Sequence, residues 1–350
     1  MRAGLVVLCS AFAVAADPPA ATRAEQVTAV RKGAKAEIER INDEFVAATT
    51  PDGKAAARKK LAEVVKRATD KLLALAKALP TDEPAFQALT DVLFDGDRAA
   101  ATDLLIQHHL GREGLAEALK EIAPDPDPAF DRLLRATAEK STLPANKMAG
   151  QLLLGWRLAD AAGASGDAKA FAEADALLTG ASKEFGDQRW ESVTVREVAD
   201  HALKVLRTLS VGRPAPEFAS RDLDGKPAKL SDLKGKVVVL DIWATNCGPC
   251  RQMIPHEREL VKRLAGRPFV LVSVSADRTK ADLTEFLKDT PMPWTHWYEG
   301  DGPNLAAWDV KAFPTIFVID AKGVIRHRGV RGKAMDEAVE KLLAEADAGK

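Results

Sequence analysis

Residues 241–250 read DIWATNCGPC, and this stretch decides the fold of the C-terminal part of the chain. It begins at the end of a valine-rich apolar run, residues 236–243, which is typical of a strand buried on both faces of a parallel sheet. A helical pattern follows over residues 250–264. Cys247 therefore lies where a strand gives way to a helix, and unpaired backbone N–H groups and the helix dipole favour a thiolate there.

The two cysteines have the spacing of a reversible dithiol–disulfide pair. A helix N-terminus can lower a cysteine pKa from about 8.5 into the range of about 3.5–7.5, so we expect Cys247 to attack. Cys250 follows one helical turn later and would resolve the mixed disulfide. A structural disulfide across two intervening residues would constrain the unfolded chain little, and a zinc site would need further ligands that the sequence does not supply. We predict redox chemistry through this pair, with no metal and no other cofactor.

The pattern beyond this segment continues to alternate strands with helices. A second valine-rich strand is expected at 268–276, and a helix at 281–288 follows it. Later we expect strands at 315–320 and 324–330, joined by a turn at 321–323, and a closing helix at 335–346. This β-α-β-α-β-β-α order predicts an α/β domain with a mixed sheet.

The preceding part of the chain has a helical pattern almost throughout. Apolar residues recur at three- and four-residue steps over 27–45 and 61–75, which predicts an antiparallel helical hairpin. Shorter helices follow, to a total of eight or nine. The Gly- and Pro-containing stretch 210–216 ends them and is typical of a linker or domain entry. We therefore predict an all-α domain over residues 17–210 and the α/β domain over 211–350.

Composition and the N-terminus place the protein among exported globular proteins. The 350 residues are 46% hydrophobic and 29% charged, enough for about two packed domains, and the net charge of −1 supplies no general attraction for nucleic acid. Residues 1–16 combine a positive start, an apolar stretch and the A-x-A pattern of a secretory signal. Its removal takes Cys9 with it and leaves the redox pair alone. We expect a periplasmic or secreted protein with no membrane span after signal removal.

Residues 211–350 resemble the thioredoxin superfamily and, within it, the extracytoplasmic TlpA/ResA-like redoxins. Four features carry this resemblance: the entry at 212–218, Trp243 followed by the CGPC site at 247–250, Phe313-Pro314-Thr315, and a β-α segment between Pro291 and Trp308. The resemblance implies a thiol–disulfide oxidoreductase in which Pro314 has a cis peptide bond and faces the cysteines. It also implies that Asp241 is a buried acid that moves the proton for Cys250.

The resemblance further implies a groove for an extended substrate chain. The expected lining is Trp243, Asn246, Gly248, Pro249, Phe313, Pro314 and Thr315. Asn246 departs from the tryptophan usual in the family, which removes a flat apolar surface beside the reactive sulfur. Because Gly-Pro between the cysteines matches the reducing thioredoxins, we expect reduction of protein disulfides, with an upstream thiol reductant. The direction depends on a reduction potential, which the sequence does not determine.

Two other functions stay open at this point. A thiol peroxidase of the redoxin class is one, although Ala244 occupies the position where peroxiredoxins have Thr or Ser. A partner-binding helical domain with a tethered redoxin is the other, and the sequence does not identify that partner or the oligomeric state. Residues 222–225 are interpreted as a hairpin turn, and the basic stretch 326–333 as a solvated strand face.

Overall fold

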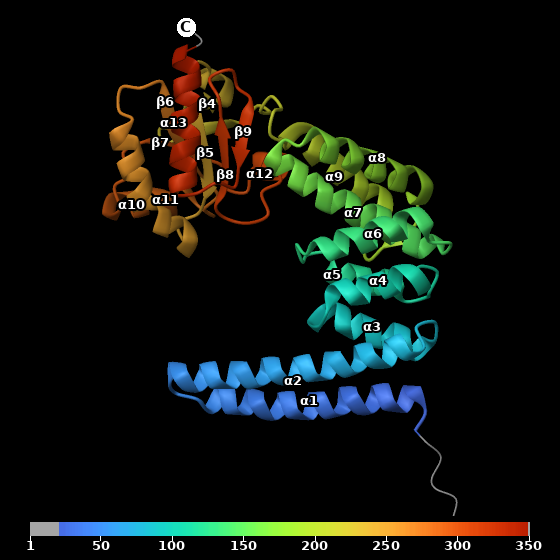
Figure 1. The fold of residues 1–350 in the computed structure, drawn as a ribbon. Coiled ribbons are helices and arrows are strands. Elements are labelled where there is room, and N and C mark those ends of the chain that lie inside the picture. The colour runs from blue at the N-terminus through green and yellow to red at the C-terminus, as the bar shows by residue number, and fades with distance from the viewer. Residues whose placement is uncertain (1–20, 349–350) are drawn as a thin grey trace, which may run out of the picture. The chain divides into compact units, whose positions relative to one another are not determined.

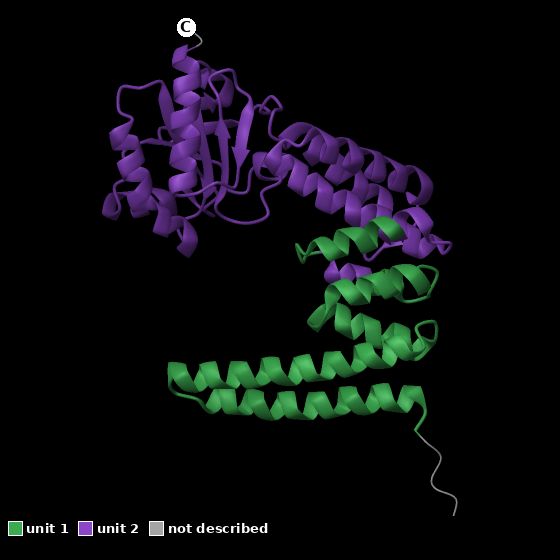
Figure 2. Ribbon diagram, viewed as in Figure 1, with its two compact units in different colours: residues 1–118, 124–136 green, residues 119–123, 137–350 purple. Residues whose placement is uncertain are grey.

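The computed structural model describes residues 21–348, and the chain divides into two compact units (Figure 2). One unit contains residues 1–118 and 124–136, and the other contains residues 119–123 and 137–350. The expected signal peptide and Cys9 lie outside the described residues. None of the helices over residues 21–348 combines the length and the apolar character that a membrane span requires.

The first unit begins with two long helices, α1 (Arg23–Ala47) and α2 (Pro51–Ala78). They run antiparallel (Figure 1) and bury Ile41, Ala57 and Val64 between them, so the predicted helical hairpin is confirmed. Thr22 and Thr50 cap the two N-termini through their side-chain oxygens. Shorter helices follow: α3 (Glu83–Asp95), α4 (Arg98–His108), α5 (Leu115–Ile122) and α6 (Pro128–Lys140).

The second unit contains the last residues of α5 and α6. Its next three helices pack around one apolar core: α7 (Pro144–Ser165), α8 (Ala168–Phe185) and α9 (Val195–Leu209). Gly155 lets α7 and α8 approach closely, because a Cβ there would lie 2.8 Å from a Leu178 side-chain carbon. A small hairpin that the sequence pattern did not predict, β1 (Arg189–Trp190) with β2 (Val193–Thr194), precedes α9. Residues 21–209 thus contain nine helices, within the predicted number.

A seven-stranded sheet follows, in the order β4-β3-β7-β6-β5-β8-β9. Its strands are β3 (Ala219–Asp222), β4 (Pro227–Lys229), β5 (Val237–Trp243), β6 (Phe269–Ser275), β7 (Thr295–Tyr298), β8 (Thr315–Ile319) and β9 (Ile325–Arg328). β5 runs parallel to β6 and antiparallel to β8, so the predicted mixed sheet is confirmed. The predicted turn at 222–225 joins β3 to β4, two short strands that the sequence pattern itself did not show.

Helices cover both faces of this sheet. α10 (Gly248–Arg263) and α13 (Lys333–Ala348) pack on the face to which Val237 and Val239 contribute, and α11 (Lys280–Asp289) continues that layer. On the other face Leu240 lies in a cluster with Phe218 and Trp308, the residue that ends α12 (Pro303–Ala307). The predicted fold class, a helical N-terminal part followed by an α/β domain, is confirmed.

The end of α9 belongs to the core of the sheet. Leu209 is fully buried in the cluster around Leu240, and Val205 packs against the same cluster. Immediately after the helix, the Val211 N–H donates to the carbonyl oxygen of Gly163 in α7 at 2.9 Å. The domain boundary after residue 210 stays a prediction, but its neighbourhood is a packed seam and not an open linker.

Candidate active site

Cys247 lies between the end of β5 and the start of α10, where it is the N-cap residue of the helix. The Cys250 N–H points at the Cys247 sulfur, 3.2 Å away, and the two sulfurs form a disulfide. Cys247 is half-buried, whereas Cys250 is only 4% exposed. A partner can therefore reach the first sulfur and not the second, which is the asymmetry that the predicted roles of attack and resolution require.

The loop before β8 lies at the same end of the sheet as the cysteines. Its Phe313–Pro314 peptide bond is cis, as the resemblance implies. Thr315 pairs with Ile242 across the ladder, so β8 starts beside the last residues of β5. Pro255 lies inside α10.

The residues predicted to line the substrate groove do not all reach the surface. Asn246, Gly248 and Pro249 are exposed, and Phe313 and Thr315 are half-buried. Pro314 is buried in the loop. Trp243 is 1% exposed and packs edge-on against Phe286, with ring centres 5.6 Å apart. Its indole therefore supports the cysteine segment from beneath, and whether the exposed residues bind substrate stays a prediction.

A cavity of about 370 Å³ opens beside the cysteine segment, and Asn246 and Phe313 line it. Asp277 contributes to its wall and accepts hydrogen bonds from the backbone N–H and the hydroxyl of Thr245, each at 2.8 Å. Arg278 and Asp301 complete the charged part of the lining. The cavity next to Asn246 is thus bordered by groups that bind polar side chains or peptide groups.

Asp241 is buried in the layer between the sheet and α10. Side chains alternate along a strand, so Asp241 points to the same side as Val237 and Val239. Burial raises the pKa of the Asp241 carboxyl to about 7, and the charge of Arg331 opposes this increase. Its Oδ1 has no hydrogen-bond partner among the described residues. A carboxyl that titrates near neutrality is suited to transferring a proton, although its predicted role toward Cys250 stays a prediction.

A second buried acid, Glu257, was missed by sequence reasoning. It lies on the inward stripe of α10, which also contains Cys250, Ile254 and Leu260, and only 1% of it is exposed. Burial raises the pKa of Glu257 to about 9, and the negative charge of Asp241 acts in the same direction. Glu257 therefore keeps its proton while Asp241 titrates. A glutamate at an apolar position of the helical stripe was the available signal.

Arg331 is a second residue whose role the sequence did not show. It lies between β9 and α13, and its Nη2 donates to the Pro314 carbonyl oxygen at 3.1 Å. The same positive charge lowers the pKa of Asp241. Of the stretch 326–333, interpreted as a solvated strand face, Arg331 and Lys333 are exposed but lie beyond the end of β9, whereas Arg326 within the strand is half-buried and pairs with Asp320 and Glu345.

Comparison with known proteins identifies relatives of the C-terminal part of the chain. The Redoxin family model matches residues 210–343. Thiol-disulfide oxidoreductase ResA of Bacillus thuringiensis subsp. konkukian is 30% identical over 135 residues, which cover 39% of this chain and 78% of the relative. The chain belongs to the ResA-like thiol–disulfide oxidoreductases of the redoxin family. Thioredoxin-like protein YneN of Bacillus subtilis is 33% identical over 133 residues, 37% of this redoxin and 78% of YneN.

A solved structure is also similar to this redoxin in sequence. The putative thiol:disulfide interchange protein DsbE of Chlorobium tepidum is 35% identical, with 40% of this chain and 99% of that chain covered and a TM-score of 0.36. The family model begins at residue 210, so helices α1 to α9 lie before the matched residues. The redoxin is therefore a thioredoxin-like enzyme joined to a helical part outside the family match.

Proposed function

We propose that this redoxin is an exported reductase of protein disulfides. The observation that carries the proposal is the asymmetry of the pair, with a half-buried Cys247 at a helix N-terminus and a buried Cys250 behind it. The signal-like residues 1–16 support export, and protein disulfides, the proposed substrates, persist in oxidising compartments outside the cytoplasm. The Gly-Pro between the cysteines supports the reducing direction.

The reaction balances within the dithiol pair and its two partners. The Cys247 thiolate attacks a substrate disulfide, forms a mixed disulfide and releases one substrate thiolate. Asp241 accepts the proton of Cys250, whose thiolate then attacks the Cys247 sulfur and releases the second substrate thiolate. Two electrons pass to the substrate, and the enzyme is left with the Cys247–Cys250 disulfide. An external thiol reductant restores the dithiol, so the cysteine pair acts without any other cofactor.

The trapping experiment compares Cys250→Ser with Cys247→Ser in the full chain. Cys250→Ser should accumulate mixed disulfides with polypeptide substrates, because attack proceeds and resolution does not. Cys247→Ser should trap few, since the remaining sulfur is buried. Trapping by Cys247→Ser alone would invert the assigned roles.

Direction and compartment need two further measurements. A Cys247/Cys250 reduction potential near that of thioredoxin, about −270 mV, supports reduction, whereas one near about −120 mV would make the protein an oxidant. Intact-mass analysis should find that exported protein starts at Ala16 or Asp17 and lacks Cys9. Rapid turnover of hydrogen peroxide without disulfide reduction would favour a thiol peroxidase instead.

A further inference from the structure

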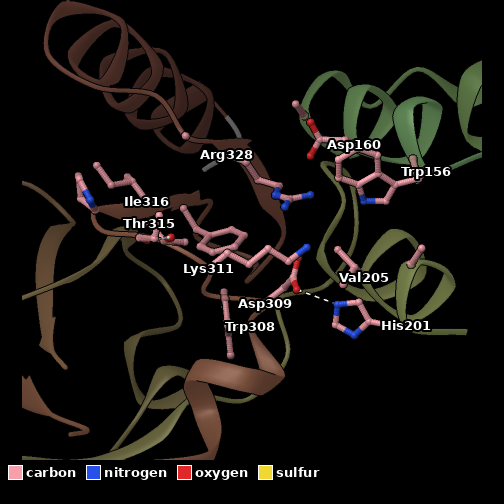
Figure 3. Close-up of a pocket in the computed structure, with 17 residues that line it drawn as sticks. Trp156, Asp160, His201, Val205, Trp308, Asp309, Lys311, Thr315, Ile316 and Arg328 are labelled. Atoms are coloured by element: carbon pink, nitrogen blue, oxygen red, sulfur yellow. Dashed lines mark hydrogen bonds and ion pairs between the residues drawn. The ribbon is translucent and has the colours of Figure 1, made fainter. Parts of the chain in front are cut away.

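A second cavity, of about 420 Å³, lies between the helices α7 and α9 and the strands β8 and β9 (Figure 3). All four elements belong to the same compact unit. The cavity reaches Pro314 and Thr315, whereas Phe313, the preceding residue, lines the cavity beside the cysteine segment. The cis-proline loop therefore borders both cavities, so a chain crossing the loop from one cavity would come to the other.

Arg328, the last residue of β9, provides hydrogen-bond donors to this second cavity. Its guanidinium lies over the Phe317 ring, 5.6 Å from the ring centre, and forms no hydrogen bond with any described residue. α7 passes close to it, because a Cβ on Gly163 would lie 2.6 Å from the Arg328 Nη1. Arg328 is half-buried, and its guanidinium has no acceptor among the described residues, so this group favours a ligand that brings an acceptor.

The other charged groups determine what kind of ligand fits. The Asp309 carboxylate accepts a hydrogen bond from His201 at 3.0 Å and forms an ion pair with Lys311 at 3.1 Å, so its charge is already balanced. Asp160 on α7 forms no hydrogen bond or ion pair with a described residue, and it is close enough to act on the charge of Arg328. An unbonded donor and an unbonded acceptor thus border one cavity. A ligand with a single charge would meet repulsion from one of them.

A peptide group has the complementary chemistry, because it is neutral and offers one carbonyl acceptor and one N–H donor. The remaining walls are apolar, with Val205 on α9 and the large indole of Trp156 at the opening, 41% exposed. Figure 3 shows Trp156, Asp160 and Arg328 around the same part of the cavity. An apolar side chain next to the bound peptide group would cover the exposed indole.

We propose that this cavity binds an extended apolar segment of the polypeptide whose disulfide is attacked by Cys247. The inference rests on the proposed function and adds to it that helices outside the family match, α7 and α9, contribute to substrate choice. Polypeptides that present an extended apolar segment near the disulfide, such as flexible or partly unfolded chains, are then the favoured substrates. Small disulfides would use the cysteines and not this cavity.

The test compares two variants in the full chain, Trp156→Ala and Arg328→Gln, on two substrates. For insulin, KM should rise about tenfold, the loss expected when one anchoring contact is removed. For hydroxyethyl disulfide, turnover should stay that of the unaltered protein. Val193→Ala is the matched control. Val193 is 38% exposed, similar to the 41% of Trp156, but it does not line the cavity. Insulin reduction by Trp156→Ala at the unaltered KM would overturn the inference.

A binding measurement separates this inference from the proposed function. Fluorescence anisotropy of labelled, S-alkylated insulin B chain reports binding without any redox step. Trp156→Ala should bind it about tenfold more weakly than the unaltered protein. If the unaltered protein reduces neither substrate but binds the alkylated chain through Trp156, the proposed function fails and the cavity assignment stands. Equal binding by both proteins overturns the cavity assignment. Because Trp156 is exposed, its variant should unfold at the same temperature as the unaltered protein, even if Arg328→Gln does not fold.

Discussion

The two faces of β5 carry opposite chemistry. On one face Leu240 and Ile242 belong to an apolar cluster with Phe218, and that cluster includes Leu209 at the end of α9. On the other face Asp241 lies in the layer covered by α10, where Glu257 is also buried. Both acids and the cysteine helix thus share one layer, while the opposite layer holds the sheet to the preceding helices. Catalysis and stability should therefore respond to different substitutions within one strand.

Asp241→Asn should have the largest effect and should act on catalysis. Loss of the proton acceptor should lower insulin turnover about 10²- to 10⁴-fold, the usual contribution of general acid–base catalysis. In the unaltered protein the rate should rise with pH through about 7, as Asp241 loses its proton, and the variant should lose this step. The free energy of unfolding should be unchanged or higher, because a buried carboxyl is replaced by a neutral group of similar shape.

Asp277→Asn is the matched control for that substitution. Asp277 is also a buried carboxyl near the cysteine segment, but it holds Thr245 through two hydrogen bonds. Its replacement should lower stability and keep the step in rate near pH 7. Equal turnover of Asp241→Asn and the unaltered protein from pH 6 to 9 would remove Asp241 from the mechanism.

The apolar face of β5 is tested by two fragments. Residues 211–350 lack Leu209, whose fully buried side chain belongs to the cluster around Leu240. This fragment should be less stable by about 2–5 kcal/mol than residues 144–350, which keep α7, α8 and α9. Urea unfolding followed by circular dichroism measures the difference. At urea concentrations at which they are folded, both fragments should still reduce hydroxyethyl disulfide. Equal stability of the two fragments would show that α9 does not complete the sheet core.

The fold was largely predictable because its main elements have strong periodic patterns. The valine-rich runs that became β5 and β6 are buried on both faces, and the long helical hairpin of α1 and α2 has a regular apolar stripe. The strands β3 and β4 were missed as strands because they are short and half-exposed, so their apolar content is low. The packing of Leu209 against the sheet could not be predicted from the neighbouring sequence, since the residues that it contacts lie far along the chain.

The site was predictable from the cysteine segment and from the resemblance. The spacing of Cys247 and Cys250 after a strand indicated their roles, whereas the resemblance implied those of Asp241 and Pro314. The charge of Arg331, in the segment before α13, acts through space on Asp241, and the charge of Asp241 acts on Glu257 in α10. Burial and charge interactions between distant segments determine these roles, so no local pattern identified them beyond a glutamate on an apolar stripe.

Glu257→Gln should change how stability depends on pH. Because the folded-state pKa of Glu257 lies above its ordinary value of 4.5, the folded protein binds this proton more tightly than the unfolded chain. The free energy of unfolding should therefore fall as pH rises toward about 9. Above about pH 8, where Asp241 has lost most of its proton, the decrease should be up to about 1.4 kcal/mol per pH unit and should come from Glu257.

Urea unfolding at pH 7, 8 and 9 measures that slope. Glu257→Gln should be nearly flat above about pH 8, and Glu259→Gln, an exposed neighbour on α10, should keep the slope of the unaltered protein. A slope retained in Glu257→Gln would show that the buried proton belongs to another group.

Arg331→Gln should have the smallest effect. The direction in which the midpoint of the pH–rate profile moves shows whether Arg331 acts on Asp241 through its charge or through its hydrogen bond to the loop. The positive charge of Arg331 lowers the pKa of Asp241, so its loss should raise that pKa and move the midpoint of the rate profile to higher pH. We expect a movement of less than about one pH unit, below the 1–3 units of a direct Asp–Arg pair. The glutamine amide can still donate to the Pro314 carbonyl oxygen, so the loop should keep its position. Arg326→Gln removes the same charge where it pairs with Asp320 and Glu345, and should leave the midpoint in place. A midpoint that moves to lower pH in Arg331→Gln, or equally in both variants, would show that Arg331 does not act on Asp241 through its charge.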